Sequence, residues 1–161
     1  MNINSEQFFM GVAVLSSHRS KDKTKVGACI VSEDNRIIGV GWNGMPKTIN
    51  DMNNDEVFSW GKDSEDPLEN KYMYIIHAEP NAIHHSSESV KNCTMYLNWF
   101  PCADCAKSIV QSGIKKLVYL KHAPTDRYRV SMEGAKRILL NGGVNIVKYN
   151  SEKDDIVINF C

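Results

Sequence analysis

Several features that are typical of secreted, membrane-bound and nucleic-acid-binding proteins are missing from this sequence. Its 161 residues carry 19 Lys and Arg against 19 Asp and Glu, so the formal net charge is zero. A dedicated binder of polyanions would usually show a basic excess or stripe. No apolar run approaches the roughly 20 residues that span a membrane, and no charged segment followed by an apolar stretch opens the chain. These absences predict a cytoplasmic protein with no nucleic-acid or membrane partner.

Cysteine is too sparse and too irregularly spaced to form a disulfide framework. The chain has 5 cysteines, a number that suits a reducing compartment when no framework is present. Cys29, Cys93 and Cys161 lack ligand spacing, and the apolar run at residues 26–31 predicts that Cys29 belongs to the core. Internal repeats and low-complexity tracts are also missing, and the length suits one domain over residues 1–161.

Two short motifs supply the residue types of a catalytic zinc site. His77, Cys102 and Cys105 would be three zinc ligands. Three protein ligands leave a tetrahedral zinc with one position for water, whereas structural zinc takes four. Glu79, two residues after the histidine, can move protons without binding the metal. Together the H-x-E and P-C-x-x-C motifs match the signature of the zinc nucleobase deaminases.

Each motif alone would be weak evidence. A C-x-x-C pair is often redox-active or half of a four-cysteine zinc site, and a lone histidine is usually structural. A redox interpretation leaves His77 and Glu79 without a role. Both motifs also follow an expected strand, and Pro80 and Pro101 mark the starts of expected helices. Two helix N-termini would then converge on one metal, and their positive ends favour thiolates.

The apolar patterns predict an α/β protein with a three-layer α-β-α architecture. Strands are expected at residues 26–31, 36–41, 72–76, 94–99, 116–120 and 145–149, with a further short strand in the tail at 156–160. Helices are expected at residues 4–18, 78–85, 102–112 and 129–141. Ser5 is the expected N-cap of the first helix, and Gly142-Gly143 should end the last. This order predicts a mixed sheet of roughly five strands, antiparallel at the first hairpin and parallel later.

The polar segment at residues 45–71 is too long for an ordinary connection, and such loops are usually either disordered or functional.

The chain resembles the deoxycytidylate (dCMP) deaminases of the cytidine deaminase-like superfamily. The segments that carry the resemblance are Arg19-Ser20-Lys21-Asp22, Val26-Gly27-Ala28, Gly41-Trp42-Asn43-Gly44-Met45-Pro46, residues 77–83 and residues 100–115. The zinc motif alone fits deaminases of free cytidine, tRNA adenosine and guanine equally well. The long insertion between Pro46 and Tyr72 and the Ser-Lys-Asp segment favour the nucleotide enzymes. The resemblance implies a cytidine deaminase-like fold.

It also implies zinc-dependent hydrolytic deamination of dCMP to dUMP and ammonia, which feeds thymidylate supply. Glu79 would take a proton from water at the zinc and pass it to N3 of cytosine and then to the leaving amine. Asn43 would contact the sugar, although an asparagine in a Gly-x-Asn-Gly turn is equally typical of a left-handed turn residue. Candidate donors to the 5′-phosphate are Arg19, Lys21, Arg127 and Tyr128, each of which would otherwise be a solvated surface residue.

Regulation and assembly follow from the same resemblance. Members of the family are often activated by dCTP and inhibited by dTTP, so both are candidate effectors, with Mg²⁺ accompanying a triphosphate. Members also often form hexamers, so a homo-oligomer is expected. Two departures are Trp42, where the family commonly has tyrosine, and the segment at residues 121–130, which is longer than usual. The pair His84-His85 hints at a second zinc but is more typical of a solvated helix.

Two rival functions stay open. One is deamination of another substrate, such as dCTP, cytidine, a C5-modified dCMP or a tRNA adenosine. Neutral net charge counts against the tRNA substrate because phosphate binding needs a basic surface. The other rival is an inactive, zinc-bound nucleotide sensor, against which the intact Glu79 counts.

Overall fold

A five-stranded mixed sheet forms the centre of the computed structural model, which describes residues 2–47, 57–123, 126–150 and 156–159. The strands are β1 (Gly27–Val31), β2 (Ile37–Trp42), β3 (Thr94–Trp99), β4 (Lys116–Lys121) and β5 (Asn145–Lys148), in the order β2-β1-β3-β4-β5. β1 pairs antiparallel with both β2 and β3, whereas β3–β4 and β4–β5 are parallel. The predicted mixed sheet is therefore confirmed.

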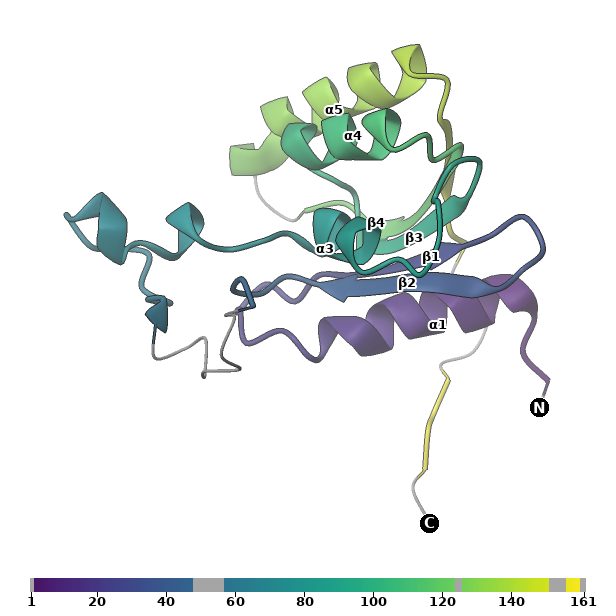
Figure 1. Cartoon of the computed structure of the whole chain (residues 1–161), viewed down its shortest axis with the longest axis horizontal. Coiled ribbons are helices and arrows are strands. Elements are labelled where there is room, and N and C mark those ends of the chain that lie inside the picture. Colours follow the sequence, from purple (N-terminus) through teal and green to yellow (C-terminus); the bar gives the residue numbers. More distant parts are fainter. Residues whose placement is uncertain (1, 48–56, 124–125, 151–155, 160–161) are drawn as a thin grey trace.

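Helices cover both faces of the sheet, which confirms the predicted three layers (Figure 1). α1 (Ser5–Ser17) lies on one face, and the other face carries α3 (Ala78–His84), α4 (Ala103–Gln111) and α5 (Arg129–Asn141). Three short 3₁₀ helices, η1 (Pro67–Glu69), η2 (Lys71–Met73) and η3 (Asp126–Tyr128), lie in the connections. Among the described residues, no helix combines the length and the apolar character that crossing a membrane requires.

Alternation along the central strands creates two cores. In β1, Ala28 and Ile30 pack into the core beneath α3, α4 and α5, whereas Cys29 and Val31 pack against α1. All five residues of β1 are buried because both faces of the strand are covered. Cys29 is 0% exposed, so the prediction that it belongs to the core is confirmed.

Gly41 allows α3 to lie directly on β2. A Cβ atom at this position would lie 2.4 Å from the Ala82 nitrogen and 2.5 Å from the Ala78 oxygen, both backbone atoms of α3. The Asn81 side-chain amide also donates to the Trp42 carbonyl at 2.7 Å, which fastens the helix to the end of the strand. The first turn of α3 is therefore placed by close contact with the sheet.

Three predictions about local structure are wrong or incomplete. Residues 72–76 do not form a strand: η2 begins at Lys71, whose carbonyl accepts from the nitrogens of Tyr74 and Ile75, and only Ile76 makes an isolated bridge, to Gly44. Tyr72 is 48% exposed, Met73 is 56% exposed and the three residues after them are only half-buried, so no fully buried face selects a strand.

At the N-terminus, Asn4 rather than Ser5 caps α1. Its side chain accepts from the Gln7 nitrogen, and the Gln7 side chain accepts from the Asn4 nitrogen, which makes a reciprocal capping box. Residues 156–159 of the tail are not in a strand, and residue 160 lies outside the described residues. The predicted end of α5 is confirmed, since Gly142 is its C-cap and Gly143 has a φ of 74°.

Candidate active site

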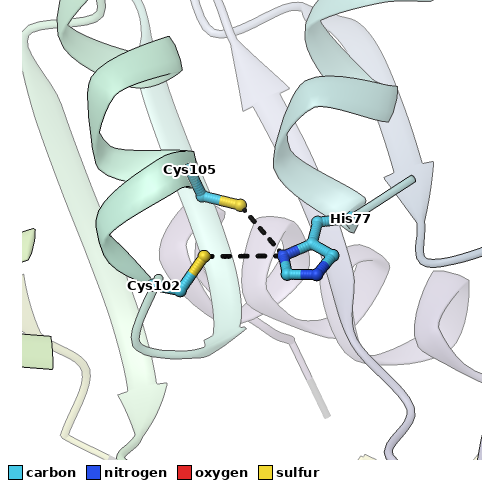
Figure 2. A group of neighbouring side chains, drawn as sticks. All are labelled: His77, Cys102 and Cys105. Carbon is cyan, nitrogen blue, oxygen red and sulfur yellow. Dashed lines mark hydrogen bonds between the residues drawn. The ribbon is translucent and has the colours of Figure 1, made fainter. Parts of the chain in front are cut away.

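The three predicted zinc ligands come from the N-termini of two helices. His77 is the N-cap of α3 and Cys102 is the N-cap of α4, and neither side chain makes the usual capping hydrogen bond. Cys105 follows one turn into α4, so that both sulfurs lie on the same side of that helix (Figure 2). The ligand side chains are thus directed toward one another instead of toward their own helices.

The three ligand atoms have the spacing of a zinc site. Nδ1 of His77 lies 3.3 Å from Sγ of Cys105 and 3.5 Å from Sγ of Cys102, and all three atoms lie within 4.8 Å of one another. A tetrahedral zinc with Zn–S of about 2.3 Å and Zn–N of about 2.0 to 2.1 Å places nitrogen and sulfur ligands about 3.6 Å apart. The donor set and its spacing therefore fit zinc. Within the described residues this is the one such group, and His84 and His85 belong to no second group.

Protonation of this group is strongly coupled. The pKa of Cys102 is lowered to about 4, first by a hydrogen bond from the Cys105 thiol and also by one from His77. The pKa of Cys105 is raised, first by the same hydrogen bond and then by burial. The pKa of His77 is raised to about 9, chiefly by its hydrogen bond to Cys102. A metal ion that these three residues bind would replace their shared protons, so metal binding must be accompanied by proton release.

Glu79 is buried beside the ligands without being one of them. Its side chain belongs to α3 and is only 3% exposed, and burial raises the pKa of its carboxyl above the ordinary value. The positive charge of His77 acts in the opposite direction. A carboxyl with a raised pKa in a pocket is suited to accept and return a proton near neutral pH.

A pocket of about 240 Å³ opens onto Glu79 and two of the ligands. Its lining residues are Asp22, Thr24, Val26, Asn43, Lys71, Tyr72, Ile75, His77, Glu79, Trp99, Phe100, Cys102, Ala123, Tyr128, Ser131 and Met132. The wall is largely apolar and aromatic, with a few polar groups. This is the usual composition of a small-molecule site.

Asn43 lines this pocket and is 6% exposed. Its Oδ1 accepts from the Val26 nitrogen at 2.9 Å, and its Nδ2 donates to the Thr24 oxygen at 2.9 Å. The alternative of a left-handed turn residue is wrong, because the non-glycine residues with positive φ in the described part of the chain are Asn35 and Asn92. Asn43 instead fastens the loop before β1.

The predicted phosphate donors are not gathered in one place. Tyr128 lines the pocket, and the guanidinium of Arg127 lies 5.8 Å from the Tyr128 ring and 5.7 Å from the Tyr72 ring. Arg19 and Lys21 are exposed and do not line the pocket. The Arg19 guanidinium lies 5.1 Å from the centre of the Trp42 ring.

Two pocket residues escaped the sequence analysis. Asp22 and Lys71 form an ion pair with 2.6 Å between Lys71 Nζ and Asp22 Oδ2, and both side chains are largely buried. In the sequence, Asp22 is only one position of a family motif and Lys71 only the end of a polar segment. They are 49 positions apart, and no local pattern signals such a pairing.

The three-layer fold and the His-Cys-Cys-Glu arrangement define a class, the zinc-dependent hydrolases that act on nucleobases. A family model described as "Cytidine and deoxycytidylate deaminase zinc-binding region" matches residues 3–121. The chain belongs to this family.

Relatives with assigned names share most of the chain. Human deoxycytidylate deaminase is 44% identical over 158 residues, which cover 96% of this chain and 84% of the human one. Deoxycytidylate deaminase of Enterobacteria phage T2 is 33% identical, with 93% and 95% covered. Among solved structures, the dCMP deaminase of cyanophage S-TIM5 in complex with dCMP and dUMP has a TM-score of 0.66 and 29% identity, covering 92% of this chain and 99% of that chain.

Proposed function

We propose that the protein is a zinc-dependent hydrolase that converts dCMP and water to dUMP and ammonia. The observation that carries this proposal is the triangle of His77, Cys102 and Cys105 with Glu79 buried in the same pocket. Named relatives support the choice of dCMP, because human deoxycytidylate deaminase is 44% identical and the cyanophage enzyme holds dCMP and dUMP. The product dUMP would enter thymidylate supply.

In the mechanism, Glu79 carries the proton. A zinc ion held by His77, Cys102 and Cys105 would supply a Lewis acid that activates water near neutral pH. Glu79 accepts the proton of the water that attacks C4 of cytosine and delivers it to N3. It then takes the second proton of that water from the hydroxyl now bonded to C4 and passes it to the departing amine, so that the C4 carbonyl forms, the C–N bond breaks and ammonia leaves. Burial keeps the Glu79 carboxyl away from bulk water, which would otherwise exchange this proton.

The other pocket residues would contact different parts of the substrate. Trp99, Phe100 and Met132 give the pocket apolar surface for the pyrimidine ring. Asn43 also lines the pocket, where it holds the loop before β1 and would contact the sugar. Arg127 is not itself in the lining, but its guanidinium lies 5.8 Å from the ring of Tyr128, which is, and these two residues would bind the 5′-phosphate. Arg19, whose guanidinium lies over Trp42, and Lys21 lie outside the lining and lose that role in our proposal.

The decisive experiment is ammonia release from dCMP, dCTP, deoxycytidine and CMP in parallel, with the zinc-loaded protein. Fast turnover of dCMP with slow turnover of deoxycytidine is expected, because deoxycytidine lacks the phosphate. Preference for dCTP, deoxycytidine or CMP would retain the zinc chemistry and overturn the choice of dCMP as substrate. No turnover of any cytosine compound, with tight nucleotide binding, would indicate the inactive sensor.

We also propose that residues 1–161 work as one deaminase domain in the cytoplasm and assemble as a homo-oligomer, with a hexamer as the expected form. Exposed apolar side chains on α1, Phe8 at 47% and Leu15 at 55%, give such an assembly a surface to cover. Effectors would be dCTP and dTTP, with Mg²⁺ bound to the triphosphate. Light scattering after size exclusion, with and without dCTP and Mg²⁺, tests both points. A monomer under all conditions, with no response of activity to either nucleotide, would refute them.

A further inference from the structure

The buried ion pair between Asp22 and Lys71 forms part of the wall of the catalytic pocket. Lys71 Nζ lies 2.6 Å from Asp22 Oδ2, with 11% and 5% of the two side chains exposed. Removing two charges from water is costly, so a buried pair is weak evidence for a purely stabilising role. Both residues line the same pocket as Glu79, so the two desolvated charges lie where a substrate would bind.

The backbone holds each partner independently of the ion pair. On one side, Asp22 Oδ1 accepts from the Thr24 nitrogen at 3.0 Å, and the Asp22 nitrogen donates to Ser20 Oγ at 3.2 Å. On the other side, the Lys71 nitrogen donates to the Gly61 oxygen at 2.6 Å. The Asp22 carboxylate and the Lys71 backbone are therefore held before any ligand arrives, and the ion pair then holds the Lys71 ammonium at the wall, which is an arrangement that favours specific recognition.

The chemistry of the pair suits a hydroxyl group better than a phosphate. A carboxylate and an ammonium side by side carry no net charge, and the carboxylate would repel an anionic ligand group. A hydroxyl, in contrast, can donate its hydrogen to the carboxylate and accept an N–H from the ammonium. Within the part of the chain that the structure describes, Asp22 accepts from one of the three N–H donors of Lys71, which leaves capacity for such a bond.

Asn43 connects this pair to the rest of the sugar side of the pocket. The Thr24 nitrogen binds Asp22, and the Thr24 oxygen accepts from Asn43 Nδ2 at 2.9 Å. Asp22, Thr24 and Asn43 thus form one hydrogen-bonded wall, and Lys71 closes it from the end of the long insertion.

We propose that Asp22 and Lys71 bind the 3′-hydroxyl of the deoxyribose and make the enzyme specific for nucleotides that carry it. The inference rests on the proposed function, because it takes the base to lie at Glu79 and the phosphate at Arg127 and Tyr128. The 3′-oxygen is then the one remaining polar group of the sugar apart from the ring and ester oxygens. In this assignment the insertion contributes to catalysis by delivering Lys71 to the substrate.

The first test needs no variant. The kcat/KM of the zinc-loaded wild-type protein is measured for dCMP and for 2′,3′-dideoxycytidine 5′-monophosphate, which differs by the 3′-oxygen alone. Loss of a hydrogen bond to charged partners predicts a fall of roughly 10- to 100-fold for the dideoxy analogue. Equal values for the two nucleotides would overturn the inference and leave the proposed function intact. If dCMP itself does not react, the proposed function fails and the inference fails with it.

The second test asks whether these two residues read the hydroxyl. The double variant Asp22→Asn/Lys71→Met keeps the shape of both side chains and an acceptor for the Thr24 nitrogen while removing the charges. The ratio between dCMP and the dideoxy analogue should fall below roughly 5-fold, since neutral hydrogen bonds are about half as strong as charge-assisted ones. Zinc content and far-UV circular dichroism show whether the variant is folded.

A matched control applies the same substitutions to an exposed ion pair. Arg36 Nε lies 2.7 Å from Asp34 Oδ2 in the hairpin between β1 and β2, and Asp34→Asn/Arg36→Met should keep the wild-type ratio. A folded Asp22→Asn/Lys71→Met protein that keeps the full wild-type ratio would show that the hydroxyl is read elsewhere, which contradicts the inference. Should that variant fail to fold, the comparison of the two nucleotides on the wild-type protein decides alone.

Discussion

Replacing Gly41 with alanine should damage the active site although Gly41 does not line the pocket. The added Cβ would lie 2.4 Å from the Ala82 nitrogen and 2.5 Å from the Ala78 oxygen. Ordinary contact begins at 3.4 Å, so α3 or β2 must move by about 1 Å. Both obstructing atoms belong to backbone, which cannot rotate away as a flexible side chain would.

The consequences follow from what α3 carries. Overpacking of this kind costs about 1 to 3 kcal/mol, which for a chain of this size lowers the melting temperature by roughly 2 to 10 °C. A shift of about 1 Å in the helix that bears His77 and Glu79 should lower kcat by about 100-fold. Thermal unfolding and dCMP turnover of the purified variant measure the two effects separately.

Gly11→Ala is the matched control. Gly11 lies within α1, its nearest obstacle is the end of the Ile156 side chain at 3.5 Å, and alanine is the better helix former. This variant should gain about 0.5 to 1 kcal/mol of stability and keep its activity. Wild-type stability and turnover in Gly41→Ala would refute the argument from close packing.

Four further outcomes are expected. Glu79→Gln should keep zinc by elemental analysis but lose at least about 100-fold in kcat, because the amide cannot carry the proton; ammonia release checks this. Cys102→Ala should lose most of its zinc, and a metal content equal to that of wild type would contradict the ligand assignment. Lys71→Met alone should lower the free energy of unfolding by about 3 to 5 kcal/mol, because it leaves the Asp22 carboxylate buried and unpaired. The double variant Asp22→Asn/Lys71→Met should recover most of this stability, and urea unfolding measures both variants. Burial raises the pKa of Cys29 from 9.0 to about 12. Because the unfolded chain loses the thiol proton at a lower pH than the folded chain, the free energy of unfolding should fall as the pH rises from 9.0 to about 12, by at most about 1.4 kcal/mol per pH unit. Unfolding of Cys29→Ala in a reducing buffer should show a smaller decline.

The zinc group could be predicted because it depends on residue types and short spacings. Cys102 and Cys105 are held on the same side of one helix by their three-residue separation, and a single histidine supplies the third ligand. The strands β1 and β3 could be predicted as well, since a strand that is covered on both faces must be a nearly continuous run of apolar residues. In these segments the residues that the local pattern predicts to be buried or clustered are also the ones that the tertiary fold buries or brings together.

The sequence predicts less well where the local pattern and the tertiary surroundings of a residue disagree. Residues 72–76 have the composition of a strand, but they follow the insertion at the rim of the pocket, where exposed Tyr72 and Met73 face no second layer. For Asn43 the sequence left a turn residue and a sugar contact as equal alternatives, and the structure removes the first because the side chain holds Thr24 and Val26. The residue types of a short segment do not show which side chain from a distant segment will form hydrogen bonds with its backbone.

The sequence by itself determined the class of chemistry, because zinc and proton transfer demand particular side chains, and His77, Glu79, Cys102 and Cys105 are recognisable wherever they lie. It also determined the layered sheet, through the periods of its apolar residues. Only the tertiary structure decided which groups line the pocket: it joined Asp22 to Lys71 across 49 positions, set Asn43 in the pocket wall and left Arg19 and Lys21 outside. The physical reason is that contacts between distant segments depend on how the layers pack, and that packing is a property of the whole chain and not of any local segment.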